Sequence, residues 1–408
     1  MQNLSSPQRI QTVDALRGMA LLGILLAHMV YWYNAGPLPG ELYGKFNGIG
    51  SQIVSILNDI FISGKFFAFF SCLFGLSFYL QMNSMALKSQ NFVWRFAWRI
   101  LVMGMIGLIH HAFWRGDILS IYAPLGLLLL LTRKWSDRWV LIIGVLFAFN
   151  IPHKLIELVH LLQPVGNNPK ALPSNQYDQE AKAFYAIVKG NSWVNIWVDN
   201  LKNLDTKFDF QFNSGRIYIT FGFFLLGMYL GRLNWLNNIN DSLPRLKAIM
   251  KKGLWVCLAL LVIGLGIILS NELFKLGWQE NRMVGFLFNI LYDGFNAVLV
   301  IVYITGFSIL LNKKSWKKIS GWFAAIGKMA LTSYLSQTLF GLLLFFGVGL
   351  GLTGKTAPWL NWFIGFAFFA IEVMLSKWWL KHYQYGPIEW FWRSVTYFKW
   401  YPMRKKED

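Results

Sequence analysis

Charged residues are scarce in this chain of 408 residues, and acidic residues are the scarcest of them. Charged side chains make up 14% of the sequence, whereas soluble domains carry about 25%. Cysteine is nearly absent, and both copies, Cys72 and Cys257, lie inside apolar runs. These shortages argue against an ordinary soluble domain, a disulfide framework and a cysteine-based zinc site.

Apolar and aromatic residues take the place of the missing charge. The sequence is 55% hydrophobic and includes 20 Trp and 35 Phe, which suits a membrane protein with aromatic belts at both interfaces. The net charge of +19 raises the question of nucleic acid. However, the basic residues lie between apolar runs rather than in one patch, so we expect contact with membrane lipids and no nucleic-acid binding.

Ten apolar runs have the length of a membrane span. They cover residues 14–33, 58–81, 98–114, 117–132, 138–158, 216–233, 253–271, 283–311, 321–349 and 359–380. The first run has no convincing cleavage site and is interpreted as a retained span rather than a signal peptide. The fold class we predict is therefore all-α, a polytopic integral membrane protein with about ten transmembrane helices in a single domain, 1–408.

The distribution of Lys and Arg sets the orientation of these spans. With a cytoplasmic N-terminus, alternation leaves few basic residues in the four short outer loops, which hold only Lys45, Arg115, Lys275, Arg282 and Lys355. The inner segments are much richer in both residues, as the positive-inside rule requires. We therefore predict that both termini are cytoplasmic.

Two segments outside the spans have a pattern of their own. Residues 159–215 form a long extracytoplasmic segment, in which we expect an amphipathic helix between Asp178 and Leu201. Residues 382–408 form a cytoplasmic interfacial tail, where the spacing of Glu389 and Arg393 predicts an ion pair along a short helix.

The first apolar run contains ionisable residues that a membrane span normally avoids. Arg17 and His28 are eleven residues apart, so both leave one face of a helix, about 16 Å apart along its axis. With Asp14 nearby, they suggest a polar path into the bilayer. The alternative is that Asp14 and Arg17 lie at the headgroups, with Arg17 snorkelling and His28 at the far end.

A second group of ionisable residues lies where the third and fourth runs meet. His110, His111, Arg115 and Asp117 fall near the outer ends of these runs, on the same side as His28. One histidine oriented by Asp117 would be a general acid or base. Polar residues at a helix interface are the alternative. The residues lack metal-ligand spacing, so we expect no metal.

The remaining candidates are single polar residues in otherwise apolar surroundings. Asp59 and Lys65 lie at the outer end of the second run, where Lys65 needs an acidic partner such as Asp59, Asp14 or Asp117. Arg216 begins the sixth run, and Gln337 belongs to a polar band in the ninth. Such residues either hold helices together or line a substrate path.

Several of these stretches together resemble a known family. They are Asp-Ala-Leu-Arg-Gly-Met-Ala-Leu-Leu-Gly-Ile-Leu at 14–25, Lys-Phe-Phe-Ala-Phe-Phe-Ser-Cys-Leu-Phe-Gly at 65–75, Gly-Asp-Ile-Leu at 116–119, Leu-Thr-Ser-Tyr-Leu-Ser-Gln at 331–337 and Tyr-Gly-Pro-Ile-Glu-Trp-Phe-Trp-Arg at 385–393. Over nearly its whole length the chain resembles the bacterial YeiB-like membrane family, domain of unknown function 418. The resemblance implies a multi-pass protein of the bacterial plasma (inner) membrane.

The first run is also similar to integral-membrane acyltransferases of the acyltransferase-3 type. Their signature is an arginine, ten residues and a histidine, which Arg17 and His28 match. The resemblance implies acyl-CoA as the donor, with Arg17 on its phosphates and His28 as general base toward a hydroxyl or amine acceptor on the outer side. His110, His111, Asp117 and Lys65 are further candidates for the acid–base or oxyanion role.

Two other functions stay open from the sequence. In a small-molecule or lipid transporter, buried charges such as Asp59, Lys65, Asp293 and Glu372 would mark the path of the substrate or a proton. In a non-catalytic membrane binding module, no polar cavity would join Arg17 to His28. The sequence also leaves a homodimer open.

Overall fold

The computed structural model describes residues 11–86, 92–163, 174–236, 239–278 and 281–405. All regular structure in these ranges is helical, apart from one isolated bridge between Tyr383 and Arg404. The helices are α1 Gln11–Met29, α2 Gly40–Gly44, α3 Ile49–Phe61, α4 Phe66–Ala86, α5 Phe92–Phe113, α6 Leu119–Leu131, α7 Asp137–Ala148, α8 Ile151–Leu162, α9 Ser174–Lys189, α10 Trp193–Lys202, α11 Leu204–Asn213, α12 Arg216–Leu233, α13 Ile239–Phe274, α14 Arg282–Leu311, α15 Lys317–Lys328, α16 Ala330–Phe345, α17 Pro358–His382 and α18 Pro387–Tyr397.

Many of these helices are long and apolar enough to cross a bilayer. Within the described ranges, six candidate spans meet this criterion: Gln11–Met29, Ile49–Ser84, Val93–Phe113, Ile239–Phe274, Arg282–Leu311 and Pro358–His382. The pair α7 and α8, bent by 46°, makes a seventh if it is counted as one span. The chain is a helical membrane protein, as the composition predicts, and the figure of ten spans stays a prediction.

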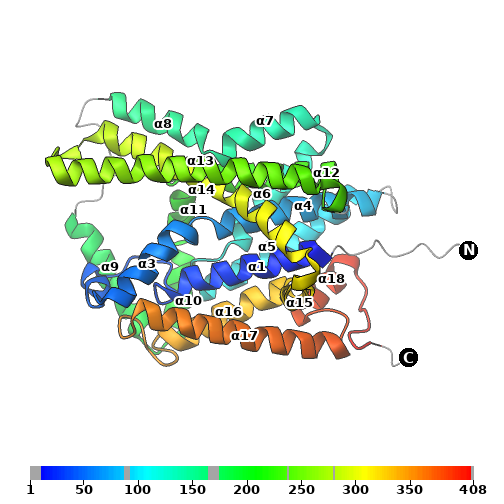
Figure 1. Ribbon diagram of the computed structural model, residues 1–408. Helices are drawn as coiled ribbons and strands as arrows, with labels where there is room; N and C mark the ends of the chain where they lie inside the picture. The colour runs from blue at the N-terminus through cyan, green and yellow to red at the C-terminus, as the bar shows by residue number, and fades with distance from the viewer. Residues whose placement is uncertain (1–10, 87–91, 164–173, 237–238, 279–280, 406–408) are drawn as a thin grey trace, which may run out of the picture.

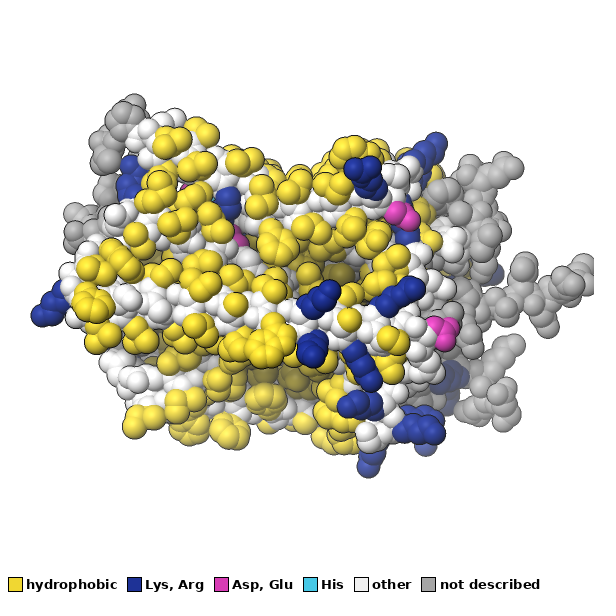
Figure 2. All heavy atoms as spheres, turned by 45° about the horizontal axis from the view of Figure 1, so that its top comes forward, with side chains coloured by type: hydrophobic (Ala, Val, Ile, Leu, Met, Phe, Trp, Pro, Cys, Tyr) yellow, Lys and Arg dark blue, Asp and Glu magenta, His cyan; other side chains and the backbone are white. Residues whose placement is uncertain are grey.

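The candidate spans differ sharply in how deeply they are buried. In α1, 67% of the apolar window is buried inside the protein, whereas in α13 only 6% is. Figure 1 shows α1 in the middle of the bundle, while α13 packs along α14 at its outside. The apolar side chains of α13 therefore form an outer face of the kind that lipid covers (Figure 2).

Glycines bring the central helices into backbone contact. A Cβ at Gly75 of α4 would lie 1.9 Å from the carbonyl oxygen of Phe224, and one at Gly227 of α12 would lie 1.9 Å from that of Cys72. Gly18 of α1 allows the same approach to α15. Small residues at helix crossings are the usual way in which membrane helices pack closely.

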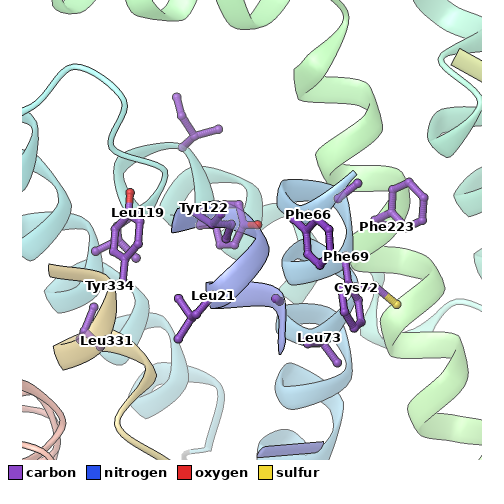
Figure 3. Packing of buried hydrophobic residues seen from close by; sticks show 14 of the residues in the cluster. Leu21, Phe66, Phe69, Cys72, Leu73, Leu119, Tyr122, Phe223, Leu331 and Tyr334 are labelled. Atoms are coloured by element: carbon purple, nitrogen blue, oxygen red, sulfur yellow. The ribbon is translucent and has the colours of Figure 1, made fainter. Parts of the chain in front are cut away.

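An apolar core fills the space between these helices. Figure 3 shows Leu21 of α1 close to Phe66 and Phe69 of α4, with Tyr122 of α6 and Phe223 of α12 around them. Leu21, Phe69 and Tyr122 have no exposed surface. The middle of the bundle around these residues is therefore packed mainly with apolar side chains.

The long segment 159–215 folds over one end of this core. Its first residues complete α8, which ends at Leu162, its residues 164–173 lie outside the described ranges, and most of the remainder forms α9, α10 and α11. Where the sequence predicts an amphipathic helix from Asp178 to Leu201, the chain has α9 and α10, separated around Gly190. Helix α10 packs against α5, and α11 packs against α12.

The C-terminal tail differs from its predicted ion pair. The Glu389 carboxylate accepts hydrogen bonds from the backbone N–H groups of Leu331 and Thr332, at 2.6 and 3.1 Å, and from the Thr332 hydroxyl. Arg393 instead faces the rings of Tyr385, Tyr397 and Tyr401. The prediction of a Glu389–Arg393 pair is wrong because the start of α16 offers Glu389 three donors.

Candidate functional site

The turn between α5 and α6 holds a buried carboxylate. Asp117 accepts hydrogen bonds from the backbone N–H groups of Leu119, at 3.1 Å, and Ser120, at 2.8 Å, and so caps α6. Its Oδ1 also lies 2.8 Å from Nδ1 of His110, which is in the last turn of α5. Asp117 is 2% exposed, so these partners replace water around its charge.

This geometry leaves His110 with a free nitrogen. A carboxylate only accepts hydrogen bonds, so Nδ1 of His110 carries the proton and Nε2 of the neutral ring is an acceptor. Nε2 is buried, and no described residue offers it a hydrogen bond. An imidazole held in this tautomer by a carboxylate has the arrangement of a general base.

A lysine from the outer segment completes the cluster. Nζ of Lys207, on α11, lies 2.7 Å from Oγ of Ser120 and 3.4 Å from Oδ2 of Asp117. It also lies 3.3 Å from Nδ1 of His111, whose Nε2 donates to the Asn200 carbonyl oxygen at 2.9 Å. Burial lowers the pKa of Lys207, and the charge of Asp117 opposes that shift. The lysine thus ties the outer segment to the turn.

Trp114 lies between two histidines of the candidate site. Its ring centroid is 4.7 Å from that of His28 and 5.9 Å from that of His110. The indole N–H donates to the carbonyl oxygen of Tyr33, which fixes the ring. Tyr334 covers the other side of His110, with ring centroids 5.0 Å apart. His28 and His110 therefore both pack against the ring of Trp114. This is consistent with their predicted placement on the same side of the membrane.

Arg115 is not part of this cluster, and it instead binds side chains of α10. Its guanidinium donates to the side chains of Asp199 and Asn200, both on α10. It also lies over the Phe184 ring, 4.5 Å from its centroid. Arg115 therefore holds α9 and α10 against the end of α5.

Four further candidates lie elsewhere in the bundle. Lys65 donates to the backbone carbonyl of Asp59 at 2.6 Å rather than to a carboxylate. The Asp59 side chain accepts from the Tyr31 hydroxyl at 3.0 Å. Gln337 donates to Glu372 at 2.8 Å and joins α16 to α17. Arg216 lies over two phenyl rings and is taken up below.

The face of α1 between Arg17 and His28 is apolar. Arg17 donates to Asp14 and to Ser77 of α4, both at 2.6 Å. On the stripe that leads from Arg17 to His28, Leu21 is fully buried and Ile24 is 6% exposed. The polar path predicted along α1 is therefore interrupted by hydrocarbon.

A group of arginines at the Arg17 end was not predicted from the sequence. The guanidinium of Arg99 lies 3.7 Å from the Trp392 ring centroid, and the charges of Arg17 and Arg393 both act on it. Nε of Arg393 is buried, and it finds no hydrogen-bond partner among the residues that the structure describes. Three guanidinium groups whose charges act on one another suit an anion with more than one negative charge.

Within the described ranges, no three His, Cys, Asp or Glu side chains converge closely enough to hold an ion. What the site at the α5–α6 turn offers is proton transfer, through His110 and Asp117, beside a second imidazole from α1.

Comparison with known proteins places these observations in a family. The family model "Protein of unknown function (DUF418)" matches residues 230–399. The uncharacterized protein YxaH of Bacillus subtilis is 30% identical, over 100% of this chain and 98% of its own length. An uncharacterized 39.9 kDa protein from the amylase 3' region of Bacillus acidopullulyticus is 25% identical, over 100% and 99%. The uncharacterized protein YeiB of Escherichia coli is 26% identical, over 95% and 96%.

Proposed function

The chain belongs to the YeiB-like DUF418 family of proteins of unknown function, and on that premise we propose that it is a membrane-embedded acyltransferase. It moves an acyl group from acyl-CoA to a hydroxyl or amine acceptor at the outer side of the membrane. The observation that carries this proposal is the buried His110–Asp117 pair with its unpartnered Nε2.

In the proposed reaction, the oxygen or nitrogen of the acceptor attacks the thioester carbonyl. At the same time, Nε2 of His110 takes the proton from that hydroxyl or amine group. Asp117 holds the ring in the required tautomer and stabilises the imidazolium that forms. When the tetrahedral intermediate collapses, the carbon–sulfur bond breaks. The imidazolium then returns the proton to the leaving thiolate, so the enzyme ends in its starting state. His28, across Trp114, is the second imidazole beside the reacting groups.

The proposed donor site is the arginine group at the other end of α1. Arg17, Arg99 and Arg393 would hold the phosphates of acyl-CoA, since guanidinium binds phosphate through paired N–H donors. Arg17 and His28 are eleven residues apart, about 16 Å along the helix axis. An extended acyl-pantetheine arm bridges that kind of distance, and it would pass beside Leu21 or displace it.

We also propose the finer topology of ten spans with both termini cytoplasmic, in the bacterial plasma membrane. Supporting it, α1 begins and α17 ends on the same side of the bundle (Figure 1), and Lys and Arg gather at that end (Figure 2). Labelling of single cysteines with a membrane-impermeant reagent in intact cells tests it. Lys275→Cys should react and Lys314→Cys should not, and the reverse result contradicts this topology.

A transporter is the second candidate, and one observation favours it. Lys154 of α8 is only 8% exposed, and its Nζ lies 3.0 Å from Oε2 of Glu157 and 3.1 Å from Oδ2 of Asp293. Buried charges between two apolar helices are common on substrate and proton paths. Passage of an unmodified substrate into proteoliposomes would support this function instead.

The test of the acyltransferase is turnover of acyl-CoA by the purified protein in lipid. Release of free CoA thiol, faster than in protein-free vesicles and dependent on His110, supports the proposal. An intact acyl-CoA pool after incubation with folded protein and a mixture of hydroxyl and amine acceptors contradicts it.

A further inference from the structure

Arg216, the first residue of α12, is a cation without a carboxylate partner. Its guanidinium lies over two phenyl rings, with Cζ 5.1 Å from the centroid of Phe67 and 5.2 Å from that of Phe210. Among the described residues it makes no hydrogen bond and no ion pair, and it is only partly exposed. Guanidinium carries five N–H donors, so Arg216 keeps its full donor capacity for a ligand.

Lys65, at the start of α4, supplies a second cation. It has no exposed surface, and within the described part of the chain it makes one hydrogen bond, to the carbonyl oxygen of Asp59. An ammonium group has three donors, which leaves Lys65 two. The Asp59 carboxylate acts on Lys65 only from a distance, and it is exposed and bonded to Tyr31.

Both cations converge on one stretch of α14. Nζ of Lys65 lies 5.3 Å from the centroid of the Tyr292 ring, and Arg216 interacts electrostatically with the same tyrosine and with His28. Lys65 and Arg216 thus both interact with Tyr292, and the charge of Arg216 also acts on His28.

The nearby carboxylate of Asp293 does not neutralise these two cations. Asp293 follows Tyr292 on α14, but its Oδ2 is held by Nζ of Lys154 at 3.1 Å and by Nδ2 of Asn150 at 3.0 Å. The N-terminus of α12 adds the partial positive charge of its unbonded N–H groups. Lys65 is fully buried, and a buried charge is stable only with an opposite charge or hydrogen-bond partners close by.

We propose that Lys65 and Arg216 bind a phosphate group carried by the acyl acceptor. Phosphate matches the set of donors, since it accepts from guanidinium, from ammonium and from a helix N-terminus. The role as acceptor rests on the proposed function, whereas binding of phosphate does not. The phosphate comes either from the headgroup of an anionic phospholipid or from a soluble phosphomonoester.

The test measures binding without any acyl donor, so that it stands apart from the test of catalysis. Purified full-length protein in detergent is titrated with sodium phosphate, against sodium chloride at equal ionic strength, and thermal unfolding is followed. We expect phosphate to raise the Tm of the wild type, with a half-saturating concentration at least about 10-fold higher in Arg216→Gln and Lys65→Gln. Arg282→Gln, which removes a cation from the start of α14, is the matched control and should behave as the wild type.

A conservative variant and a lipid arm complete the experiment. Arg216→Lys should keep part of the response, and it replaces Lys65→Gln as the comparison if the latter does not fold. In nanodiscs, loss of the phosphate response with phosphatidylglycerol, but not with phosphatidylcholine, identifies the lipid headgroup as the source. A response that survives both lipids identifies a soluble phosphomonoester. Equal effects of phosphate and chloride, or a wild-type response in Arg216→Gln, overturn the proposal.

Discussion

Nδ1 of His110 lies 2.8 Å from Oδ1 of Asp117, across the turn that joins α5 to α6. The same carboxylate caps α6 and meets Lys207 from the outer segment. One aspartate therefore fixes the histidine tautomer, the start of a helix and the position of α11. The predictions below separate these roles.

Asp117→Asn removes the negative charge of this residue but keeps a side chain that can cap α6. Asparagine caps a helix about as well as aspartate, so α6 should still begin at Leu119. The imidazolium of His110 would lose its counter-ion, and we expect kcat/KM for acyl transfer to fall about 10³-fold. This kcat/KM is measured by discontinuous assays of CoA release. The assays use variant protein whose Tm shows that it is folded. Asp137→Asn, which alters an exposed ion pair with Arg232, is the control and should retain activity. Wild-type kinetics in Asp117→Asn would remove Asp117 from the mechanism.

Lys207→Met tests the link between the outer segment and the turn. Removal of one partner from a buried charge cluster costs about 3–5 kcal/mol of unfolding free energy, and we expect a loss of this order. Burial also lowers the pKa of Lys207 in the folded protein. Just below the ordinary lysine pKa, this residue therefore binds more protons in the unfolded chain than in the folded protein. This residue's contribution to the unfolding free energy therefore rises with pH up to about 10.4.

The measurement for Lys207 is denaturant unfolding of wild type and variant over a range of alkaline pH. The difference between the two unfolding free energies should grow with pH in that window. Lys202→Met, on the exposed side of α10, is the control. A difference that stays constant, or shrinks, contradicts the assignment of a lowered pKa to Lys207.

Gly227→Ala tests the backbone contact between α12 and α4. The added methyl would lie 1.9 Å from the Cys72 carbonyl oxygen, so the helices must separate. Overpacking of this kind costs about 1–3 kcal/mol or more. Gly266→Ala in α13 is the matched control, because a Cβ there meets nothing within 4 Å, and alanine favours a helix by about 1 kcal/mol. Equal Tm values for the two variants would show that α4 and α12 do not pack as described.

Arg99→Gln and Arg393→Gln test the proposed donor site. Loss of a charged hydrogen bond to phosphate should raise KM for acyl-CoA about 10-fold, with kcat little changed. Acyl-pantetheine, which lacks the nucleotide phosphates, should be used equally well by the wild type and both variants. Arg232→Gln, an arginine paired with Asp137, is the control. An unchanged KM for acyl-CoA in both variants would place the donor elsewhere.

Much of the fold could be predicted because apolar runs of spanning length are local signals. Their internal breaks are less visible. The predicted span 58–81 is divided between α3 and α4, where Gly64 has a positive φ of 80°. The predicted span 321–349 ends one helix at Lys328 and begins another at Ala330, where Glu389 binds the free N–H groups of α16. Glu389 is distant in sequence, so no pattern within the run could reveal it.

The candidate site, like the fold, could be predicted only in part from the sequence. His110 and Asp117 are seven residues apart across a turn, and their proximity follows from the sequence. Lys207 is 90 residues from Asp117, and neither its neighbours nor its spacing mark it as buried. Arg393 looks like half of a helical ion pair until its aromatic surroundings are known. Tertiary contacts of this range leave no periodic trace in a single sequence.

The most direct test of the proposed chemistry compares wild type with His110→Gln in lipid vesicles that contain acyl-CoA and a mixture of hydroxyl and amine acceptors. Glutamine keeps a hydrogen-bond donor near Asp117 but cannot take up a proton at neutral pH. We predict that the wild type releases CoA thiol and forms acylated product, while folded His110→Gln does so at least about 100-fold more slowly. Equal rates of CoA release by the two proteins, or no release by the wild type, would contradict the account.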